Sequence, residues 1–270
     1  MLIKEYRITN NCSNAEYQVA QLYNVAEMSK AESGGGEGVE ILTNEPYEDE
    51  LRKGQFTHKI YHLESKLPSW IRSLMPAGAT KCQERAWNAF PWCKTVITND
   101  YMKESFSVTV ESFHVDGDRG QLDNALNLSP EVLKQREVVS IDVANDPKSY
   151  HLQTFNPTKE DVNTSFSQKA LRGPLQGSWA KTCDPVMTCY KLVSIEFKWY
   201  GLQTKMESYM HSVERDLFTK FHRELFCSMD GWYGLTMDSI REMEKRTKDE
   251  LALKMSAPAA NGSSSAVVAK

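Results

Sequence analysis

The sequence lacks the cysteine patterns that indicate a disulfide framework or a zinc site. No CxxC pair occurs among its six cysteines, which are Cys12, Cys82, Cys93, Cys183, Cys189 and Cys227. Cys183 and Cys189 also lack the paired histidines of a zinc finger. A secretory signal is missing as well, because Lys4, Glu5 and Arg7 interrupt any apolar run near the start. We therefore expect reduced thiols, no metal ion and a cytoplasmic protein.

The sequence also lacks net positive charge and long apolar runs. Its 32 Lys and Arg residues and 36 Asp and Glu residues give a formal charge of −4. This balance disfavours nucleic-acid partners, which are bound through phosphate contacts, and it disfavours strong electrostatic anchoring on acidic membranes. No stretch approaches the length of a transmembrane helix, and neither end carries a lipidation motif. We expect membrane contact to be peripheral, reversible and made by the folded surface.

Signatures of catalysis are equally scarce. A thiol hydrolase pair of Cys93 with His58 or His62 is conceivable, but nothing in the spacing supports it. A glycine run at residues 34–38 follows a predicted helix and precedes a predicted strand, whereas a phosphate-binding loop lies between a strand and the helix it opens. The run is better explained as a flexible turn. The sequence therefore predicts a protein that is not an enzyme.

What the sequence does contain is a series of alternating segments followed by long amphipathic ones. Alternation predicts strands at residues 2–9, 39–44, 55–63, 93–99, 105–112, 136–143 and 186–200. Helical spacing and capping residues predict helices at residues 13–30, 67–74, 130–135, 204–227 and 236–253. Because the strands come first and the longest helices last, we predict an α+β fold with a mostly antiparallel sheet.

The connections complete the predicted layout. The acidic segment between the strands at 39–44 and 55–63 is expected to form the long tip of a hairpin. Residues 145–184 are polar and weakly periodic, which predicts a long and partly irregular loop. We expect one domain over residues 1–253, followed by a disordered Ala- and Ser-rich tail at residues 254–270.

Polar side chains fall on several apolar faces of these elements. Three strand faces have this mixed character: Thr57, Lys59 and Tyr61; Cys93, Thr95 and Ile97; and Lys191 with Cys189, Val193, Ile195, Phe197 and Trp199. On the last helix, Glu244 shares a seam with Ile240, Thr247 and Leu251. A lysine on an apolar face must reach water, lose its proton or meet an anion. Each feature alone also fits an ordinary structural role, but together they predict a pocket for an amphiphilic ligand.

Seven segments in order resemble a class I phosphatidylinositol transfer protein. These are NCSNAEYQVAQLYNVAEMSK, GGGEGVEILTNEPYE, GQFTHKIYHLESKLP, AWNAFPWCKTVITN, RGPL, CYKLVSIEFKWYGLQTK and LTMDSIREMEKRTK. The resemblance extends from residue 1 to about residue 253 and is interrupted mainly between residues 116 and 168. It implies a START-like helix-grip fold, in which a concave, mostly antiparallel sheet and long helices enclose a single phospholipid.

The resemblance also implies a function. Family members carry phosphatidylinositol or phosphatidylcholine between membranes and supply phosphoinositide synthesis. Exposing two acyl chains of about sixteen carbons costs on the order of 25 kcal/mol, so such a carrier must enclose them. We therefore expect phospholipid cargo, no separate cofactor, phosphoinositide kinases as partners and a monomer. A lipid-sensing signalling adaptor without net transport is the alternative, because it needs the same pocket.

The matching segments assign the head group to eight residues. The resemblance implies that the phosphate is bound by Gln21, Thr95, Lys191 and Ser112, the last standing where many relatives have threonine. It implies that the inositol ring is bound by Thr57, Lys59, Asn88 and Glu244. Without the resemblance, we would interpret Glu244 as half of a helix-surface ion pair with Lys248.

Further positions follow from the same resemblance. Cys93 is expected to be a cavity thiol beside the phosphate. Trp199 and Tyr200 stand where relatives often carry two tryptophans that dock on the membrane, and both residue types suit the bilayer interface. Core packing is the alternative for Trp199. Ser167, which precedes basic residues, matches a phosphorylated serine of the family, although it also fits an ordinary loop hydroxyl.

Overall fold

One eight-stranded sheet organises the computed structural model, which describes residues 1–33, 38–62, 69–73, 80–147 and 161–256. Its strands are β1 (Leu2–Asn10), β2 (Gly38–Glu48), β3 (Lys53–His62), β4 (Lys81–Ala89), β5 (Trp92–Thr98), β6 (Phe106–Asp116), β7 (Glu137–Ile141) and β8 (Met187–Phe197). Their order across the sheet is β2-β3-β4-β5-β6-β8-β1-β7. Neighbouring strands are antiparallel except for β1 and β7, which are parallel.

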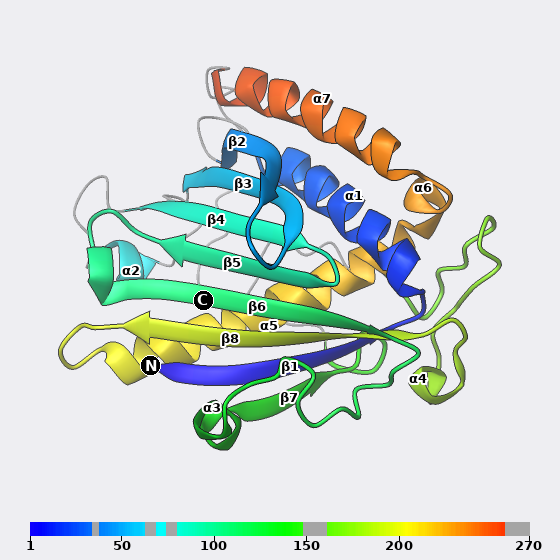
Figure 1. The fold of residues 1–270 in the computed structure, drawn as a ribbon, viewed down its shortest axis with the longest axis horizontal. Helices are drawn as coiled ribbons and strands as arrows, with labels where there is room; N and C mark the ends of the chain where they lie inside the picture. The colour runs from blue at the N-terminus through cyan, green and yellow to red at the C-terminus, as the bar shows by residue number, and fades with distance from the viewer. Residues whose placement is uncertain (34–37, 63–68, 74–79, 148–160, 257–270) are drawn as a thin grey trace, which may run out of the picture.

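Two long helices, α1 (Asn14–Glu32) and α5 (Gln203–Cys227), lie behind this sheet in the view of Figure 1, and a third, α7 (Met237–Ser256), lies beside the edge strand β2. The helical elements are α1 (Asn14–Glu32), α2 (Ser69–Arg72), the 3₁₀ turn η1 (Lys103–Ser105), α3 (Pro130–Gln135), α4 (Trp179–Thr182), α5 (Gln203–Cys227), α6 (Met229–Trp232) and α7 (Met237–Ser256). Of these, α1, α5 and α7 are the long ones. Across the described ranges, none of the helices combines the length and apolarity needed to cross a bilayer. The predicted α+β class with a mostly antiparallel sheet is confirmed.

The start of α1 is fixed by its own sequence and by a distant arginine. Ser13 caps the helix, and its backbone N–H donates to the Glu16 carboxylate at 2.8 Å, which completes the predicted capping box. The same carboxylate accepts two hydrogen bonds from the Arg172 guanidinium, at 2.9 and 2.8 Å. This bidentate pair ties α1 to the segment before α4 and fixes the helix that carries Gln21.

The hairpin of β2 and β3 has a shorter tip than predicted. β2 continues through Pro46, which is paired with Gln55, so only residues 49–52 separate the two strands. The prediction of a long tip was wrong, because β2 extends four residues beyond the predicted end at residue 44 and β3 begins two residues before the predicted start at residue 55. β2 is an edge strand of the sheet, where the missing N–H of proline interrupts no further ladder.

β4 was missed in the sequence, although it lies between β3 and β5 in the sheet. Its residues that face the helices are small or polar: Cys82, Glu84, Ala86 and Asn88. An alternation of this kind carries no apolar signal, because the period-two rule relies on a buried apolar face. The polar inner face of β4 indicates that this side of the sheet accommodates polar groups.

Other boundaries differ by a few residues. β8 ends at Phe197, so Trp199 and Tyr200 lie in the turn beyond the strand, and α7 continues to Ser256. The predicted loop at 145–184 contains α4 and an isolated antiparallel bridge between Ser167 and Arg172. The predicted glycine turn at 34–37, parts of the predicted helix at 67–74, residues 148–160 of the loop, and the tail from residue 257 lie outside the described residues.

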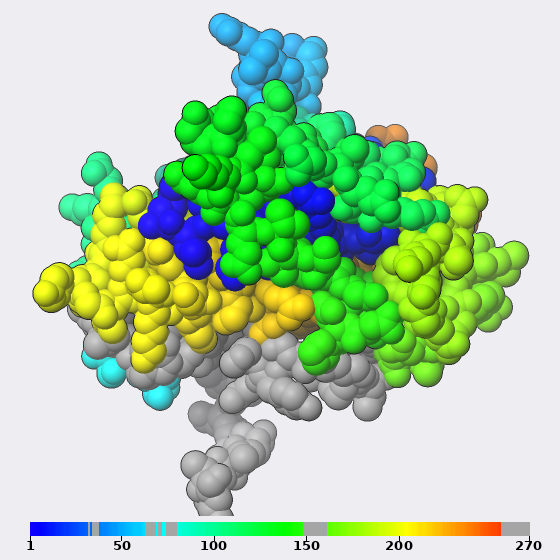
Figure 2. Space-filling view, turned by 90° about the horizontal axis from the view of Figure 1, so that it is seen from below, coloured from blue at the N-terminus to red at the C-terminus, as the bar shows by residue number. Residues whose placement is uncertain are grey.

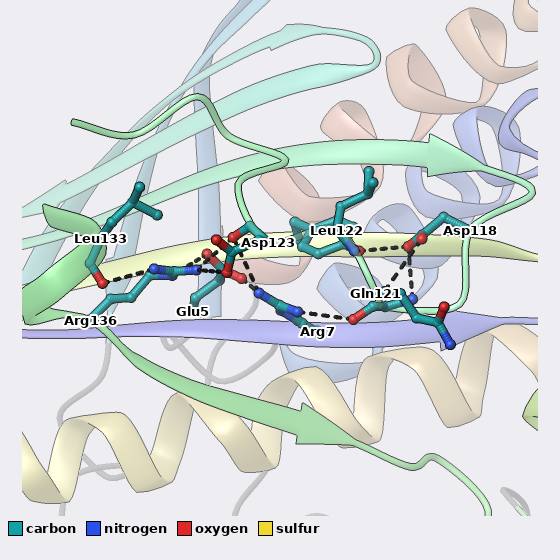
Figure 3. Close-up of polar contacts among 10 residues, drawn as sticks. Glu5, Arg7, Asp118, Gln121, Leu122, Asp123, Leu133 and Arg136 are labelled. Carbon is teal, nitrogen blue, oxygen red and sulfur yellow. Dashed lines mark hydrogen bonds and ion pairs between the residues drawn. The ribbon is translucent and has the colours of Figure 1, made fainter. Parts of the chain in front are cut away.

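The opposite face of β1 and β8 is covered by the chain between β6 and β7. Figure 2 shows β1 (blue) partly covered by the green segment that includes this connection. Glu5 is fully buried there and accepts hydrogen bonds from Arg7 Nε and Arg136 Nε, each at 2.7 Å (Figure 3). The two arginines also donate to the carbonyls of Gly120 and Asp123. One buried carboxylate thus holds the covering loop to the sheet.

Removal of Glu5 should destabilise the fold strongly. We expect Glu5→Ala to lower the free energy of unfolding by about 3–5 kcal/mol, because two nearly buried guanidinium groups lose their counter-charge. Glu137→Ala is the matched control, since it removes an ion pair to Lys4 in which Glu137 is 60% exposed. The control should change stability by less than about 1 kcal/mol. Chemical denaturation of both variants measures these changes in the free energy of unfolding. Equal losses in the two variants would contradict the role given to Glu5.

Candidate functional site

Strand pairing brings the predicted site residues of the sheet into adjacent rows on the helix-covered face. Directly opposed residues on neighbouring strands point to the same face, with Cβ atoms about 4.5–5.5 Å apart. One row consists of Gln55, Asn88, Cys93, Ser112, Lys191 and Tyr6. The next consists of Asn44, Thr57, Ala86, Thr95, Val110 and Val193, and the third contains Lys59, Glu84, Ile97, Val108 and Ile195. Residues far apart in the sequence therefore form one polar band.

Lys191 is the isolated cation of this band. Its Nζ lies 5.3 Å from the centre of the Phe218 ring of α5, and within the described ranges no ion pair joins it to an acidic residue. Burial, together with the charge of Lys191, lowers the pKa of both His114 and His222 to about 3. Both imidazoles are therefore neutral at pH 7. A cation in such surroundings is suited to binding an anion.

Hydrogen-bond donors gather near this cation. The Nε2 atom of Gln21, on α1, is buried and has no hydrogen-bond partner among the described residues. The Cys93 thiol donates to Asn88 Oδ1 at 3.3 Å. Burial raises the pKa of this thiol to about 12, even though the nearby Lys191 charge and the Gln21 amide act in the opposite direction. The structure thus brings Gln21, Cys93, Asn88 and Lys191 together, and Ser112 lies buried between Cys93 and Lys191 in the sheet.

A second polar group lies farther along the sheet, around Lys59. Its Nζ donates to Glu84 Oε1 at 2.9 Å, and the Tyr61 hydroxyl donates to Glu84 Oε2 at 2.9 Å. Burial would favour the neutral amine, but the neighbouring Glu84 carboxylate raises the pKa of Lys59 above its ordinary value. The face that alternation predicted for Thr57, Lys59 and Tyr61 is therefore the face turned toward the helices.

Glu244 reaches this polar group from α7. Its carboxylate accepts a hydrogen bond from Arg241 at 2.6 Å and one from Asn44 at 3.4 Å, and Asn44 is paired with Thr57 in the sheet. The alternative ion pair with Lys248 is wrong, because Lys248 donates instead to the Leu42 carbonyl. The predicted seam is confirmed: Ile240, Thr247 and Leu251 are buried, and the Glu244 side chain is 15% exposed.

Two acidic residues of the site were missed in the sequence. Glu84 was lost together with β4. Glu214, on α5, is surrounded by protein but keeps accessible surface, and burial raises the pKa of its carboxyl to about 7, while Lys191 opposes this shift. Its position four residues after Met210 and three before Leu217 could have placed it on the apolar stripe of the helix. No cluster that could hold a metal ion occurs in the part of the chain that the structure describes.

The remaining predicted positions lie away from the polar band. The turn after β8 projects from one end of the molecule (Figures 1 and 2), and Tyr200 is fully exposed there. Trp199 is half-buried and its ring stacks on Phe197, with centres 6.2 Å apart, which agrees with the core-packing alternative for this residue. Ser167 is buried, and its hydroxyl donates to Asp230 Oδ1 at 2.5 Å. These positions do not join the head-group residues.

Comparison with known proteins decides the family. The model of the family described as "Phosphatidylinositol transfer protein" matches residues 1–249. The chain belongs to this family. Its relatives include phosphatidylinositol transfer protein 1 of Dictyostelium discoideum, 48% identical over 260 residues, or 94% of this chain and 96% of the relative. The human phosphatidylinositol transfer protein beta isoform is 46% identical over 277 residues, or 99% of this chain and all of the relative.

Family membership confirms the resemblance seen in the sequence and the START-like fold that it implied. In this family member the curved sheet and the three long helices are formed by the described residues (Figure 1). The roles assigned to individual head-group residues stay predictions, and their arrangement in one band is the structural support for them.

Glu214 should make the stability of the protein depend on pH. Its pKa of about 7 in the folded state lies above the 4.5 of an unperturbed glutamate, so the bound proton stabilises the folded protein. This contribution is fully present below pH 4.5 and is lost as the pH rises through 7. We expect Glu214→Gln, which mimics the neutral form, to raise the melting temperature by about 2–5 °C at pH 8.

Thermal melts at pH 4 and pH 8 test this expectation. At pH 4 wild type and Glu214→Gln should melt within about 1 °C of each other, because the Glu214 carboxyl is then mostly neutral in both the folded and the unfolded state. Glu137→Gln, at an exposed position, should shift neither melt. The same shift at both pH values for Glu214→Gln would show that the carboxyl is not the titrating group.

Proposed function

We propose that the protein is a phospholipid carrier that binds one phosphatidylinositol or phosphatidylcholine molecule between its sheet and helices and exchanges it between membranes. The observation that carries the proposal is Lys191, a cation without an acidic partner among the described residues, on an otherwise apolar strand face. Both lipids bring an obligatory phosphate anion to such a site. Gln21 Nε2 and the Thr95 and Ser112 hydroxyls supply the donors that a buried phosphate requires.

The acyl chains require apolar surface close to this phosphate site. Met210, Val213, Leu217 and Phe221, which the sequence places on the apolar stripe of α5, are half-buried in the structure. Apolar side chains that keep accessible surface on a helix packed against the sheet are suited to contact lipid chains. We therefore assign the chains to the region between α5 and the sheet.

The same proposal includes the location of the protein and its partners. It is a cytoplasmic monomer without catalytic activity, cofactor or nucleic-acid partner, and its cargo is the phospholipid. It contacts membranes transiently, and the exposed Tyr200 of the turn after β8 serves that contact together with Trp199. Phosphoinositide kinases are the partners that consume the delivered lipid.

Lipid movement between vesicles tests the function. Donor vesicles carry labelled phosphatidylinositol or phosphatidylcholine, and label in unlabelled acceptor vesicles is measured after adding the protein. We expect the protein to accelerate transfer of both lipids well above the spontaneous rate. Binding of either lipid without any transfer would contradict the carrier and establish the lipid-sensing adaptor.

Substitutions around Lys59 should separate the two lipids. We expect Lys59→Ala or Asn88→Leu to reduce phosphatidylinositol transfer by about tenfold or more, because inositol hydroxyls lose hydrogen-bond partners. Phosphatidylcholine transfer should stay within about twofold of wild type, since a methylated ammonium needs no such partners. Paired transfer assays measure both rates. Equal loss of the two activities would contradict the assignment of Lys59 and Asn88 to the inositol ring.

Ser167 should act as a switch for both lipids together. Its buried hydroxyl donates to Asp230, whose carboxylate also accepts from the backbone N–H groups of Gln168 and Lys169. A phosphate or glutamate at this position would place negative charge against that carboxylate. We expect Ser167→Glu to reduce transfer of both lipids at least about threefold by disturbing the packing of α6 before α7.

Two controls accompany this variant in the transfer assay. Ser167→Ala removes the hydroxyl without adding charge and should transfer both lipids within about twofold of wild type. Gln168→Glu adds the same charge at the exposed neighbouring side chain and should also be near wild type. Normal rates for Ser167→Glu, or loss of only one lipid, would rule out this account.

A further inference from the structure

The turn between β5 and β6, at residues 99–105, lies beside the turn after β8, at residues 198–202. β6 and β8 are paired along their whole length up to these turns, and the backbone N–H of Lys198 donates to the Ser105 carbonyl at 2.7 Å. Both turns lie at the end of the molecule that is on the left in Figures 1 and 2. They therefore form one surface, which we call the end surface.

Each of the two turns exposes a tyrosine. Tyr101 is 55% exposed and Tyr200 is fully exposed, whereas the neighbouring Met102 belongs to the hydrophobic core. Single exposed apolar side chains are common on protein surfaces, but two tyrosines on adjacent turns present a combined aromatic surface. A ring with a hydroxyl at its tip is suited to a boundary between an apolar layer and water.

The first turn holds Tyr101 in a fixed position. Asn99 is buried, and its side-chain oxygen accepts hydrogen bonds from the backbone N–H groups of Tyr101 and Met102, each at 3.0 Å. Its amide donates to the Lys81 carbonyl at 2.8 Å. Lys103 has a φ of 49°, which a residue other than glycine keeps only where its surroundings fix the backbone. Binding through Tyr101 therefore requires little further ordering of the chain.

The charges of the end surface cancel. Residues 100–105 and 196–205 contain three lysines and three acidic residues. Lys198 forms an ion pair with Glu196 at 3.1 Å. Such a surface has no net attraction for acidic lipids or for a highly charged protein, whereas tyrosine enters the bilayer interface without requiring a charged head group. The end surface therefore fits a zwitterionic phospholipid bilayer.

We propose that Tyr101 and its turn form a second membrane-docking element beside the turn after β8, and that the Tyr101 ring enters the interface of zwitterionic bilayers. The inference rests on the proposed carrier function and extends the membrane contact of Tyr200 to a neighbouring turn of the sheet. Tyr101 acts on the bilayer and not on the bound cargo. It holds the protein on the membrane while a lipid is exchanged.

Vesicle binding and lipid transfer by Tyr101→Ala test the proposal. We expect about fivefold weaker binding to phosphatidylcholine vesicles and about fivefold slower transfer of both lipids, because the ring no longer buries apolar surface in the bilayer interface. Raising the salt concentration from about 50 mM to about 500 mM should change vesicle binding by less than about twofold, since the charges of the end surface cancel.

Leu122→Ala is the matched control. Leu122 is 44% exposed and lies in the loop that covers β1 and β8 (Figure 3), where its backbone N–H donates to the Tyr190 hydroxyl. The control removes an exposed apolar side chain outside the end surface. It should bind vesicles and transfer both lipids at the wild-type rate.

Tyr101→Trp separates docking from folding. Tryptophan also suits the bilayer interface, so this variant should bind vesicles and transfer both lipids within about twofold of wild type. Native mass spectrometry should find the same phospholipid occupancy in Tyr101→Ala as in wild type. Failure of tryptophan to restore transfer, or a lower occupancy in Tyr101→Ala, would give Tyr101 a structural role and overturn the proposal. Should Tyr101→Ala fail to fold, Tyr101→Gln takes its place with the same expectations.

Two further outcomes overturn the proposal. Unchanged vesicle binding and transfer in Tyr101→Ala would remove this turn from the membrane contact and leave its tyrosine to a protein partner. Binding that weakens about tenfold or more at high salt would show attachment by charge. If wild-type protein moves neither lipid, the carrier function fails, and vesicle binding by Tyr101→Ala still decides the inference on its own.

Discussion

Lys191 carries a positive charge on the face of β8 that is packed against α5, and the rest of the site is arranged around that charge. Taking an ammonium group out of water without a partner costs free energy. An anion or polar neighbours must therefore offset the cost of burying the Lys191 ammonium. The structure supplies hydroxyl, thiol and amide groups in the rows beside it, and it lowers the pKa of the nearby histidines so that they add no competing charge. We propose that a phospholipid phosphate satisfies this arrangement, and the family to which the chain belongs is named for the transfer of such a lipid.

The starts of α1 and α6 are both tied to the segment that precedes α4. The segment around Arg172 binds Glu16 at the start of α1, and five residues earlier Ser167 binds Asp230 in α6. α6 leads into α7, which brings Glu244 over the polar band. A change in this one surface segment therefore reaches two helices that cover the site, which links the proposed modification of Ser167 to lipid exchange as a whole and not to one head group.

Much of the fold follows from local sequence signals, and the exceptions have physical reasons. The capping box of Ser13 and Glu16 and the strong alternation of β8 locate their elements to within a few residues. β4 gives no such signal, because its inner face carries Glu84 and other small or polar groups where a period-two pattern expects apolar ones. The parallel pairing of β7 with β1 depends on a long connection, which no local pattern specifies.

The site residues also include some that the sequence signals and others that it does not. Lys191 and Lys59 can be found as charges on mixed strand faces, but their assignment to a phosphate and an inositol ring came from the family resemblance. The sequence does not reveal that Glu84 is the partner of Lys59, since the two lie 25 positions apart and meet only through strand register. Nor does it reveal the raised pKa of Glu214, which arises from burial by distant elements.

The most direct measurement is native mass spectrometry of the purified wild-type protein and of Lys191→Met, with the bound lipid identified after its release. Met keeps the length and apolar character of the lysine stem but removes the charge. The account predicts one phospholipid per wild-type chain and a marked loss of bound phospholipid in the variant, whose circular dichroism spectrum should match that of wild type. Full occupancy in Lys191→Met, or wild-type protein without any phospholipid, would contradict it.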